Sequence, residues 1–522
     1  MIIEKVKLYN FRRFYETTEI YFNEKNNILV GDNGIGKSTI IEAILLTISG
    51  SISKVEKVGL ERVMNSTAIS EYLDKKESCL LPKTRVEVYL KTDDIKLYGL
   101  HNSERKLHSG VSMTMEPNDE FVKELDDFKN STSMSFPFDY YKITFCTFQG
   151  SDYNQYSRIF SYTKFAFDAL SNDYEIGKYI KKKYEDLLDD SSKSTLNHKY
   201  REALHTFTDA AHVNYPQLKG DISYHANTVG SSLLNHNLTL RVRNQDIWNL
   251  GKGEKLLTII SSAIESAKSN CLDFVFIEEP ESHLTSRNTR ELISELNSIQ
   301  NCQSFVSTHD SMIASGIGLK SVNLVTEGGI ISLNKLPDQT SKFFQKTTNN
   351  NLLNFVINQK VVLVEGNAEY IVMPELIDKI TSTKEGGTTT EIISVDGLSF
   401  TRYLDIAKIS NSKVAIITDN DGNYTRNINE KYREYINENI QVFSDTDNSI
   451  NTFEVSIYRN NSTLLDEYLG SAQRYKGVQS YMLSNKTEAS FELLELLRSN
   501  SDFKNKFIVP KYIEEAIKWI RR

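Results

Sequence analysis

The chain has 522 residues, of which 39% are hydrophobic and 25% charged, and its 61 basic and 69 acidic residues give a net charge of −8. This length allows more than one domain, and the acidic balance gives no general nucleic-acid footprint, although a local basic groove and metal ions can still bind DNA. Because no long apolar run or signal-peptide core is evident and the four cysteines stand far apart, we expect a cytoplasmic protein without a disulfide framework or membrane segment.

The N-terminal residues are predicted to form strands that lead into a helix. Alternation over residues 2–9 predicts a strand with Ile3 on the face opposite Val6 and Leu8. A returning strand is expected at residues 18–22. A short buried strand at residues 28–30 runs into a Gly-rich loop and then an apolar helix. Further strands are predicted at residues 86–90, 141–148, 272–277 and 304–307.

Residues 155–220 differ in character from the segments on either side. Helix-forming, charged and polar residues dominate, including lysines at 181–183. We interpret this stretch as a helical insertion in the first domain and expect it to take part in dimerisation. The lysine run is interpreted as a solvated helix face rather than a DNA contact.

A largely polar stretch at residues 338–351 separates two parts of the chain. We therefore assign residues 1–345 to a first domain, 346–356 to a linker and 357–522 to a second domain. In the second domain, strands predicted at residues 361–364, 392–395 and 414–418 alternate with helical stretches. This alternation predicts an α/β domain with a largely parallel sheet.

Residues 31–39, GDNGIGKST, form a complete Walker A motif between a predicted strand and a predicted helix. In such a loop the backbone N–H groups and the helix N-terminus surround the phosphates of a nucleotide. Lys37 is expected to reach the β- and γ-phosphates of ATP, and Ser38 to bind Mg²⁺. The predicted nucleotide-binding residues of the loop are Asn33, Gly34, Gly36, Lys37, Ser38 and Thr39.

A Walker B arrangement follows later in the chain. The apolar strand at residues 274–277 ends in Glu278 and Glu279. Glu278, where Asp is commoner, is predicted to bind Mg²⁺, and Glu279 is predicted to act as the general base toward the attacking water. His309, just after the next strand, resembles the switch histidine that touches the γ-phosphate.

Two weaker motifs complete the predicted ATP site. Residues 250–254, LGKGE, resemble a degenerate ABC signature, in which Gly251 and Gly253 would cap the γ-phosphate held by a partner subunit; a helix entry turn is the alternative. Gln149 is the predicted Q-loop residue. The first domain therefore resembles the ABC-type ATPase heads of SMC, RecF and OLD proteins, with no long coiled coil.

Acidic residues also follow the apolar strands of the second domain. Glu365 ends the strand at residues 361–364, and Asp419 and Asp421 follow the strand at 414–418. Carboxyl ends of parallel strands meet at one sheet edge, so these carboxylates are expected to gather there. Hard oxygen ligands suit Mg²⁺ or Mn²⁺, and two such ions can activate water and stabilise a phosphodiester during cleavage. This pattern resembles a Toprim domain.

The chain as a whole resembles the OLD (overcoming lysogenisation defect) family of ATP-dependent endonucleases, which includes the nuclease subunit of the Gabija anti-phage system. The resemblance implies that Glu369 and Glu454 are further metal ligands and that Lys486 faces the scissile phosphate. The loop at residues 395–400 and the segment beginning at Pro510 also match. Glu365 would be a ligand and the base.

The resemblance further implies ATP and Mg²⁺ or Mn²⁺ as cofactors, DNA as substrate, and a homodimer or larger assembly formed through the ATPase domains. A helicase-like or other defence protein would be the partner, and anti-phage defence or phage competition the role. Two alternatives stay open: a RecF-like ATP-dependent DNA-binding protein without nuclease activity, and a primase or topoisomerase.

Overall fold

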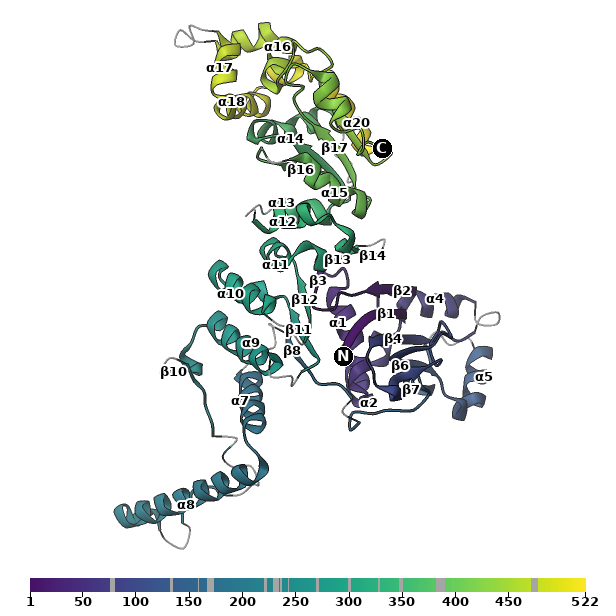
Figure 1. The fold of residues 1–522 in the computed structure, drawn as a ribbon, viewed down its shortest axis with the longest axis vertical. Coiled ribbons are helices and arrows are strands. Elements are labelled where there is room, and N and C mark those ends of the chain that lie inside the picture. Colours follow the sequence, from purple (N-terminus) through teal and green to yellow (C-terminus); the bar gives the residue numbers. More distant parts are fainter. Residues whose placement is uncertain are drawn as a thin grey trace. The chain divides into compact units, whose positions relative to one another are not determined.

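The computed structural model describes residues 1–75, 80–131, 135–157, 159–166, 173–219, 223–228, 234, 237–242, 244–268, 272–298, 302–326, 329–346, 351–381, 390–397, 399–470 and 477–522. Figure 1 labels the helices and strands of the chain. By its internal contacts the chain divides into two compact units. The first contains residues 1–157 and 308–522, and the second contains residues 158–307.

An antiparallel sheet opens the first unit. Its order is β2 (Phe14–Tyr21), β1 (Ile2–Phe11), β4 (Thr84–Lys91), β6 (His108–Pro117) and β5 (Tyr98–Gly99), and β7 (Tyr141–Thr147) also pairs with β6. The predicted alternation along β1 is wrong at Ile3, because a register shift between Ile3 and Lys5 turns Ile3 to the buried face with Val6 and Leu8.

The first unit also carries strands that hold the Walker A loop. β3 (Asn26–Val30) runs parallel to β13 (Val322–Thr326), and β14 (Gly329–Ser332) pairs antiparallel with β13. β3 leads through the loop into α1 (Lys37–Ser49), which packs against β4 and β6. Other helices in this part are α2 (Ile52–Val58), α3 (Leu60–Val63), α4 (Ser66–Asp74), α5 (Val122–Asn130) and α11 (Ser311–Ile317).

The second unit combines a parallel group of strands with long helices. β11 (Phe274–Glu278) lies between β12 (Gln303–Thr308) and β8 (Tyr162–Ala166). The helices are α7 (Asp173–Leu187), α8 (Asp190–Asn214), α9 (Lys252–Lys268) and α10 (Ser286–Asn297), and β9 (Arg241–Val242) pairs with β10 (Gln245–Asp246). The predicted helical insertion is therefore wrong at its start, because β8, aromatic and β-branched, is a strand of the sheet.

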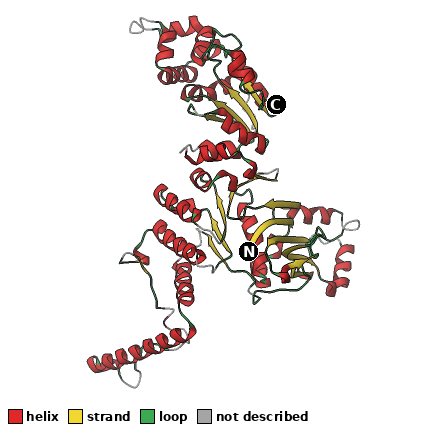
Figure 2. Cartoon of the chain, in the orientation of Figure 1, coloured by secondary structure: helices red, strands yellow, loops and turns green. Residues whose placement is uncertain are grey.

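The C-terminal part of the chain is built on a parallel sheet, as predicted. Its order is β16 (Glu391–Ser394), β15 (Lys360–Val364), β17 (Lys413–Ile417) and β18 (Ile440–Phe443). Helices pack against these strands (Figure 2). Those that contact the strands are α14 (Asn367–Thr381), α15 (Phe400–Ser410) and α20 (Lys511–Arg521). Further helices contribute buried residues to the same core, namely α16 (Phe453–Leu469), α17 (Val478–Ser484), α18 (Lys486–Ser499) and α19 (Ser501–Lys506).

The polar segment predicted as a linker is helical where the structure describes it. α12 (Asp338–Lys346) and α13 (Asn351–Ile357) flank residues 347–350, which lie outside the described residues. Phe344 and Phe355 are buried and pack edge-on against Tyr403 of α15, with ring centroids 5.2 and 5.1 Å away. These aromatic contacts explain why the polar segment is not an extended connector. Among the described residues, no helix is long and apolar enough to cross a membrane.

Candidate functional site

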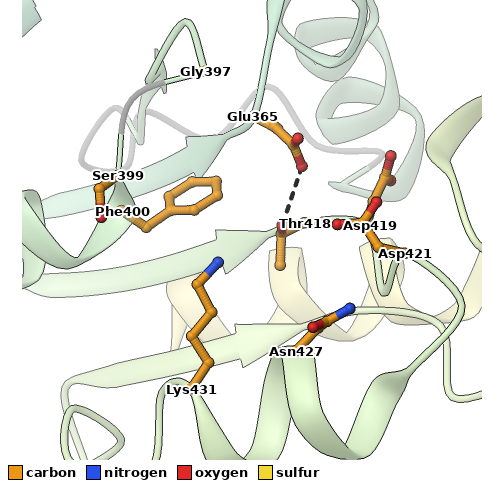
Figure 3. Close-up of a pocket in the computed structure, with 9 residues that line it drawn as sticks. All are labelled: Glu365, Gly397, Ser399, Phe400, Thr418, Asp419, Asp421, Asn427 and Lys431. Carbon is orange, nitrogen blue, oxygen red and sulfur yellow. Dashed lines mark hydrogen bonds between the residues drawn. The ribbon is translucent and has the colours of Figure 1, made fainter.

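Adjacent strand ends bring Glu365 and Asp419 to one edge of the parallel sheet. β15 and β17 pair in register up to Val364 and Ile417, so the next residues leave the sheet side by side. Thr418, at the end of β17, donates a hydrogen bond from Oγ1 to Oε2 of Glu365 at 3.3 Å (Figure 3). Apolar strands with acidic ends therefore position these groups, as the sequence pattern led us to expect.

Asp419 lies in a cluster of carboxylates. Burial, together with the negative charges of Glu369, Glu365 and Glu454, raises the pKa of Asp419 to about 8. Glu369 is 7% exposed, and burial raises its pKa, even though the backbone N–H of Gly366 donates to its Oε2 at 3.1 Å. Without a cation nearby, this edge of the sheet disfavours full ionisation.

Glu454 and Lys486 are placed together by two helix N-termini. Glu454 lies in the first turn of α16, where Thr452 caps the helix, and Lys486 is the first residue of α18. Lys486 Nζ lies 3.1 Å from Oε2 of Glu454. Burial acts to lower the pKa of Lys486, but Glu454, Asp419 and Glu369 raise it overall, so the ammonium stays charged.

The loop after β17 is organised by Asn420, a residue that the sequence analysis did not single out. Its buried Nδ2 donates to the carbonyls of Asp445 (2.8 Å), Asp447 (3.0 Å) and Ile450 (3.1 Å). Its Oδ1 accepts from the N–H of Gly422 at 2.8 Å. These bonds hold the next residue, Asp421, exposed and with a left-handed φ of 49°, a costly conformation of a kind that gathers at functional sites.

A polar cavity of about 300 Å³ lies beside these carboxylates. It is lined by Glu365, Gly397, Ser399, Phe400, Thr418, Asp419, Asp421, Asn427 and Lys431 (Figure 3). Gly397 and Phe400 belong to the predicted loop after β16, whose Leu398 lies outside the described residues. Sequence reasoning missed Thr418, Asn427 and Lys431. The polar residue at a strand end was the available indication for Thr418.

The residues present fit a divalent cation chemically. Oε1 of Glu454 is buried and accepts no hydrogen bond from any residue that the structure describes. Together with the raised pKa of Asp419, this leaves carboxylate oxygens whose charge a hard cation would neutralise. Within the described ranges, no three acidic, histidine or cysteine side chains already form a metal shell, so a cation would have to draw the ligands closer.

The Walker A loop has the geometry of a phosphate-binding turn. Lys37 is 4% exposed, and its Nζ donates to the carbonyls of Gly31 (2.7 Å) and Asp32 (2.9 Å). Gly36 caps α1 at a φ of 109°, a conformation that L side chains rarely adopt. Asn33, Gly34 and Ser38 are exposed, and Thr39 is half-buried. Lys37 therefore rests on the loop's own carbonyls, and the N-terminus of α1 is open to an anion.

The predicted Walker B acids lie at the end of β11 in the second unit. Glu279 has a left-handed φ of 48°, and its N–H donates to the carbonyl of Ser307 at 2.8 Å. Glu278 forms an ion pair with Lys164 of β8, with Oε1 2.8 Å from Nζ. This lysine, which the sequence did not suggest, gives Glu278 a structural role beside its predicted role as a Mg²⁺ ligand.

The structure shows the local surroundings of the residues in the weaker ATP-site predictions. Gly251 is exposed immediately before α9, and Gly253 lies in its first turn. Gln149 is exposed in the turn after β7, and His309 is exposed after β12. Their predicted contacts with nucleotide stay predictions.

Models of known protein families match residues 5–315 and residues 358–421 of the chain. A model described as an AAA domain matches residues 5–210, and a model described as "AAA domain, putative AbiEii toxin, Type IV TA system" matches residues 109–315. The TOPRIM domain of overcoming lysogenization defect-like proteins matches residues 358–421. The chain joins an ATPase domain to an OLD-like Toprim domain. The Toprim match includes Glu365, Glu369, Asp419 and Asp421, whereas Glu454 and Lys486 lie beyond it.

The chain matches short segments of two curated relatives and spans a quarter or less of the length of each. The chain is 51% identical over 47 residues to a DNA double-strand break repair Rad50 ATPase of Methanopyrus kandleri, which covers 9% of this chain and 5% of that protein. It is 29% identical over 93 residues to the DNA replication and repair protein RecF of Alkaliphilus oremlandii, covering 18% and 25%. The SMC head domain from Thermotoga maritima gives a TM-score of 0.33 at 14% identity, covering 64% of this chain and 99% of that one.

Proposed function

We propose that this protein is an ATP-regulated, metal-dependent DNA endonuclease. The observation that carries the proposal is the group of carboxylates around Asp419, at the carboxyl edge of an OLD-like Toprim sheet and next to the charged Lys486. Such a group concentrates negative charge where a phosphodiester, itself an anion, would bind only together with cations. The arrangement favours phosphodiester chemistry over a purely structural role.

The roles of the residues follow from their positions. Glu365, Glu369, Asp419, Asp421 and Glu454 would hold Mg²⁺ or Mn²⁺, which, when bound, supplies an activated water and charge neutralisation. Lys486 stays charged beside Glu454 and would stabilise negative charge on the scissile phosphate. Glu365 would also accept the proton of the attacking water, and Thr418 orients that carboxylate through its hydrogen bond.

The ATPase domain would control assembly or access to the nuclease site. ATP would bind at the Walker A loop through Lys37 and Ser38, with Glu278, Glu279, His309 and Gln149 in the roles predicted from their motifs. Gly251 and Gly253 would complete the site of a second copy, which makes the active form a homodimer or larger. Anti-phage defence or phage competition, with a helicase-like or other defence partner, is the biological role that the family resemblance supports.

The proposal is tested by nicking and linearisation of supercoiled plasmid DNA in the presence of Mg²⁺ or Mn²⁺, each with and without ATP. We expect metal-dependent conversion to open-circular or linear DNA, and a rate that changes with ATP. DNA binding that responds to ATP, without cleavage in either metal, would instead support the RecF-like DNA-binding function. A covalent protein–DNA adduct would support topoisomerase chemistry.

A further inference from the structure

The segment after β17 contributes a second lysine to the carboxylate cavity. The π-helical turn η10 (Thr425–Glu430) carries Asn427, and Lys431 follows it directly. Both residues line the cavity that Glu365, Asp419 and Asp421 also line. The side chain of Lys431 extends into this cavity, with its ammonium end toward the drawn residues (Figure 3).

Lys431 differs from Lys486 in lacking an acidic partner. Lys486 is paired with Glu454, whereas Lys431 forms no ion pair with any residue that the structure describes, although three carboxylates line the same cavity. The Nζ atom of Lys431 lies 5.1 Å from the centroid of the ring of Tyr432, the next residue in the chain. Lys431 and these acidic side chains thus share a cavity of about 300 Å³ without forming an ion pair, which leaves room for a ligand between them.

The backbone on either side of Lys431 is held by buried side chains. Ile428 and Tyr432 are 2% and 1% exposed, and the ring of Tyr432 lies 6.4 Å from that of Phe400 at the start of α15. Tyr435 donates a hydrogen bond to Oδ1 of Asp405, also on α15, at 3.1 Å. The lysine therefore extends from an anchored segment, and less conformational entropy is lost when it binds a ligand.

The N-terminus of α15 also makes this side of the cavity suitable for an anion. Ser399 and Phe400, at the N-terminus of α15, line the cavity, so the positive end of an 11-residue helix adds to the charge of Lys431.

We propose that Lys431 binds a backbone phosphate of the DNA strand at the Toprim site, between the metal-binding carboxylates and the N-terminus of α15. This assignment rests on the proposed nuclease function and adds a second phosphate contact to the one expected of Lys486. Lys431 is then a positioning residue, since it fixes the strand relative to the carboxylates while they and Lys486 act on the reacting phosphate.

The experiment measures binding of a fluorescent duplex to the full chain in Ca²⁺, at several salt concentrations, and plasmid nicking in Mg²⁺ or Mn²⁺. The variants are Lys431→Ala, Lys431→Arg and the matched control Arg433→Ala, which removes the same charge from an exposed position two residues away. Melting temperatures establish that each variant folds. Loss of one phosphate contact should weaken binding about tenfold at low salt and reduce the slope of log affinity against log salt by about 0.9.

We expect Lys431→Ala to raise KM more than it lowers kcat, Lys431→Arg to restore most of the affinity, and Arg433→Ala to stay within about twofold of the parent. This inference is wrong if the parent nicks DNA and Lys431→Ala keeps the parental affinity and salt slope, or changes them no more than Arg433→Ala does. The proposed nuclease function would still stand in that case. A parent that neither binds nor nicks DNA in any metal would overturn both.

Discussion

Lys486 Nζ lies 3.1 Å from Oε2 of Glu454, a side chain that is 2% exposed. The lysine itself is about half exposed, so the pair joins a buried acid to a cation that can still reach a ligand. The pairing restrains Lys486 beside the carboxylates and keeps it charged.

Replacement of this lysine should therefore impair cleavage selectively. Lys486→Ala is expected to lower the nicking rate by about 100-fold, because a charge that stabilises the phosphate in the transition state is lost. ATP hydrolysis should be unchanged. Lys504→Ala is the matched control, because it removes a lysine that pairs with Glu375 at 3.2 Å, away from the cavity. Equal nicking by both variants would exclude the assigned role.

The contribution of Asp419 to the stability of the metal-free protein should fall as pH rises. The pKa of Asp419 is raised from 3.8 to about 8 in the folded state, so the folded protein binds this proton more tightly than the unfolded chain. The stabilisation is present below about pH 4 and is lost progressively up to about pH 8. Asp419→Asn, which mimics the neutral acid, should match the parent near pH 4 and melt at a higher temperature at pH 8.

Added Mn²⁺ should reverse this order at pH 8, because the parent gains a bound cation and the variant loses a ligand. Melting curves with and without metal at pH 4, 6 and 8 measure both effects. A difference between parent and variant that does not change with pH would contradict the description of the carboxylate cluster.

Replacement of the Walker A lysine, Lys37, should impair ATP hydrolysis without affecting the metal-binding carboxylates of the Toprim domain. Lys37→Ala should slow ATP hydrolysis by more than about 100-fold, because the lysine no longer contacts the β- and γ-phosphates. The rise in melting temperature that Mn²⁺ gives should persist in this variant, since the Toprim carboxylates are untouched. Undiminished ATP turnover would rule out the Walker assignment.

The signature-like segment predicts that nucleotide joins two copies of the chain. A Cβ at Gly251 would meet no atom within 4 Å, so Gly251→Asp should fold normally while placing a negative charge where a partner's γ-phosphate is expected. Sedimentation velocity with and without ATP should show nucleotide-dependent association of the parent that the variant has lost. A parent that stays monomeric in both conditions would remove the composite-site model.

Much of the site could be predicted from the sequence because an apolar strand that ends in acidic residues is visible within a few consecutive residues. Glu365, Asp419 and Asp421 needed only strand boundaries and the parallel arrangement that alternating elements imply. The pairing of Glu454 with Lys486 was not predicted, because it depends on two helix N-termini about thirty residues apart that no local pattern brings together. The family resemblance implied only that Glu454 is a metal ligand and that Lys486 faces the scissile phosphate.

Other features depend on tertiary packing and could not be read locally. Lys431 lies among charged residues, a pattern typical of a solvated surface, and its place in the lining of the cavity depends on the tertiary packing that brings η10, α15 and the strand ends together. The burial of Ile3 could not be predicted because a register shift in β1 alters the alternation of side chains. The strand β8 could not be predicted because it lies in a polar region and pairs with β11, which is distant in the sequence. Propensity identifies strands well only where apolar runs mark them.

The nuclease account is tested most directly by nicking of supercoiled DNA in Mn²⁺ by the parent, Asp419→Asn, Glu365→Gln and the exposed-acid control Glu434→Gln. Each substitution keeps the shape of the side chain and removes one negative charge, and ATP hydrolysis measured on the same preparations reports on the other domain. The account predicts nicking by the parent and by Glu434→Gln, nicking reduced by at least about 100-fold in the other two variants, and unchanged ATP turnover in all four. Nicking at the parental rate by both Asp419→Asn and Glu365→Gln would contradict it.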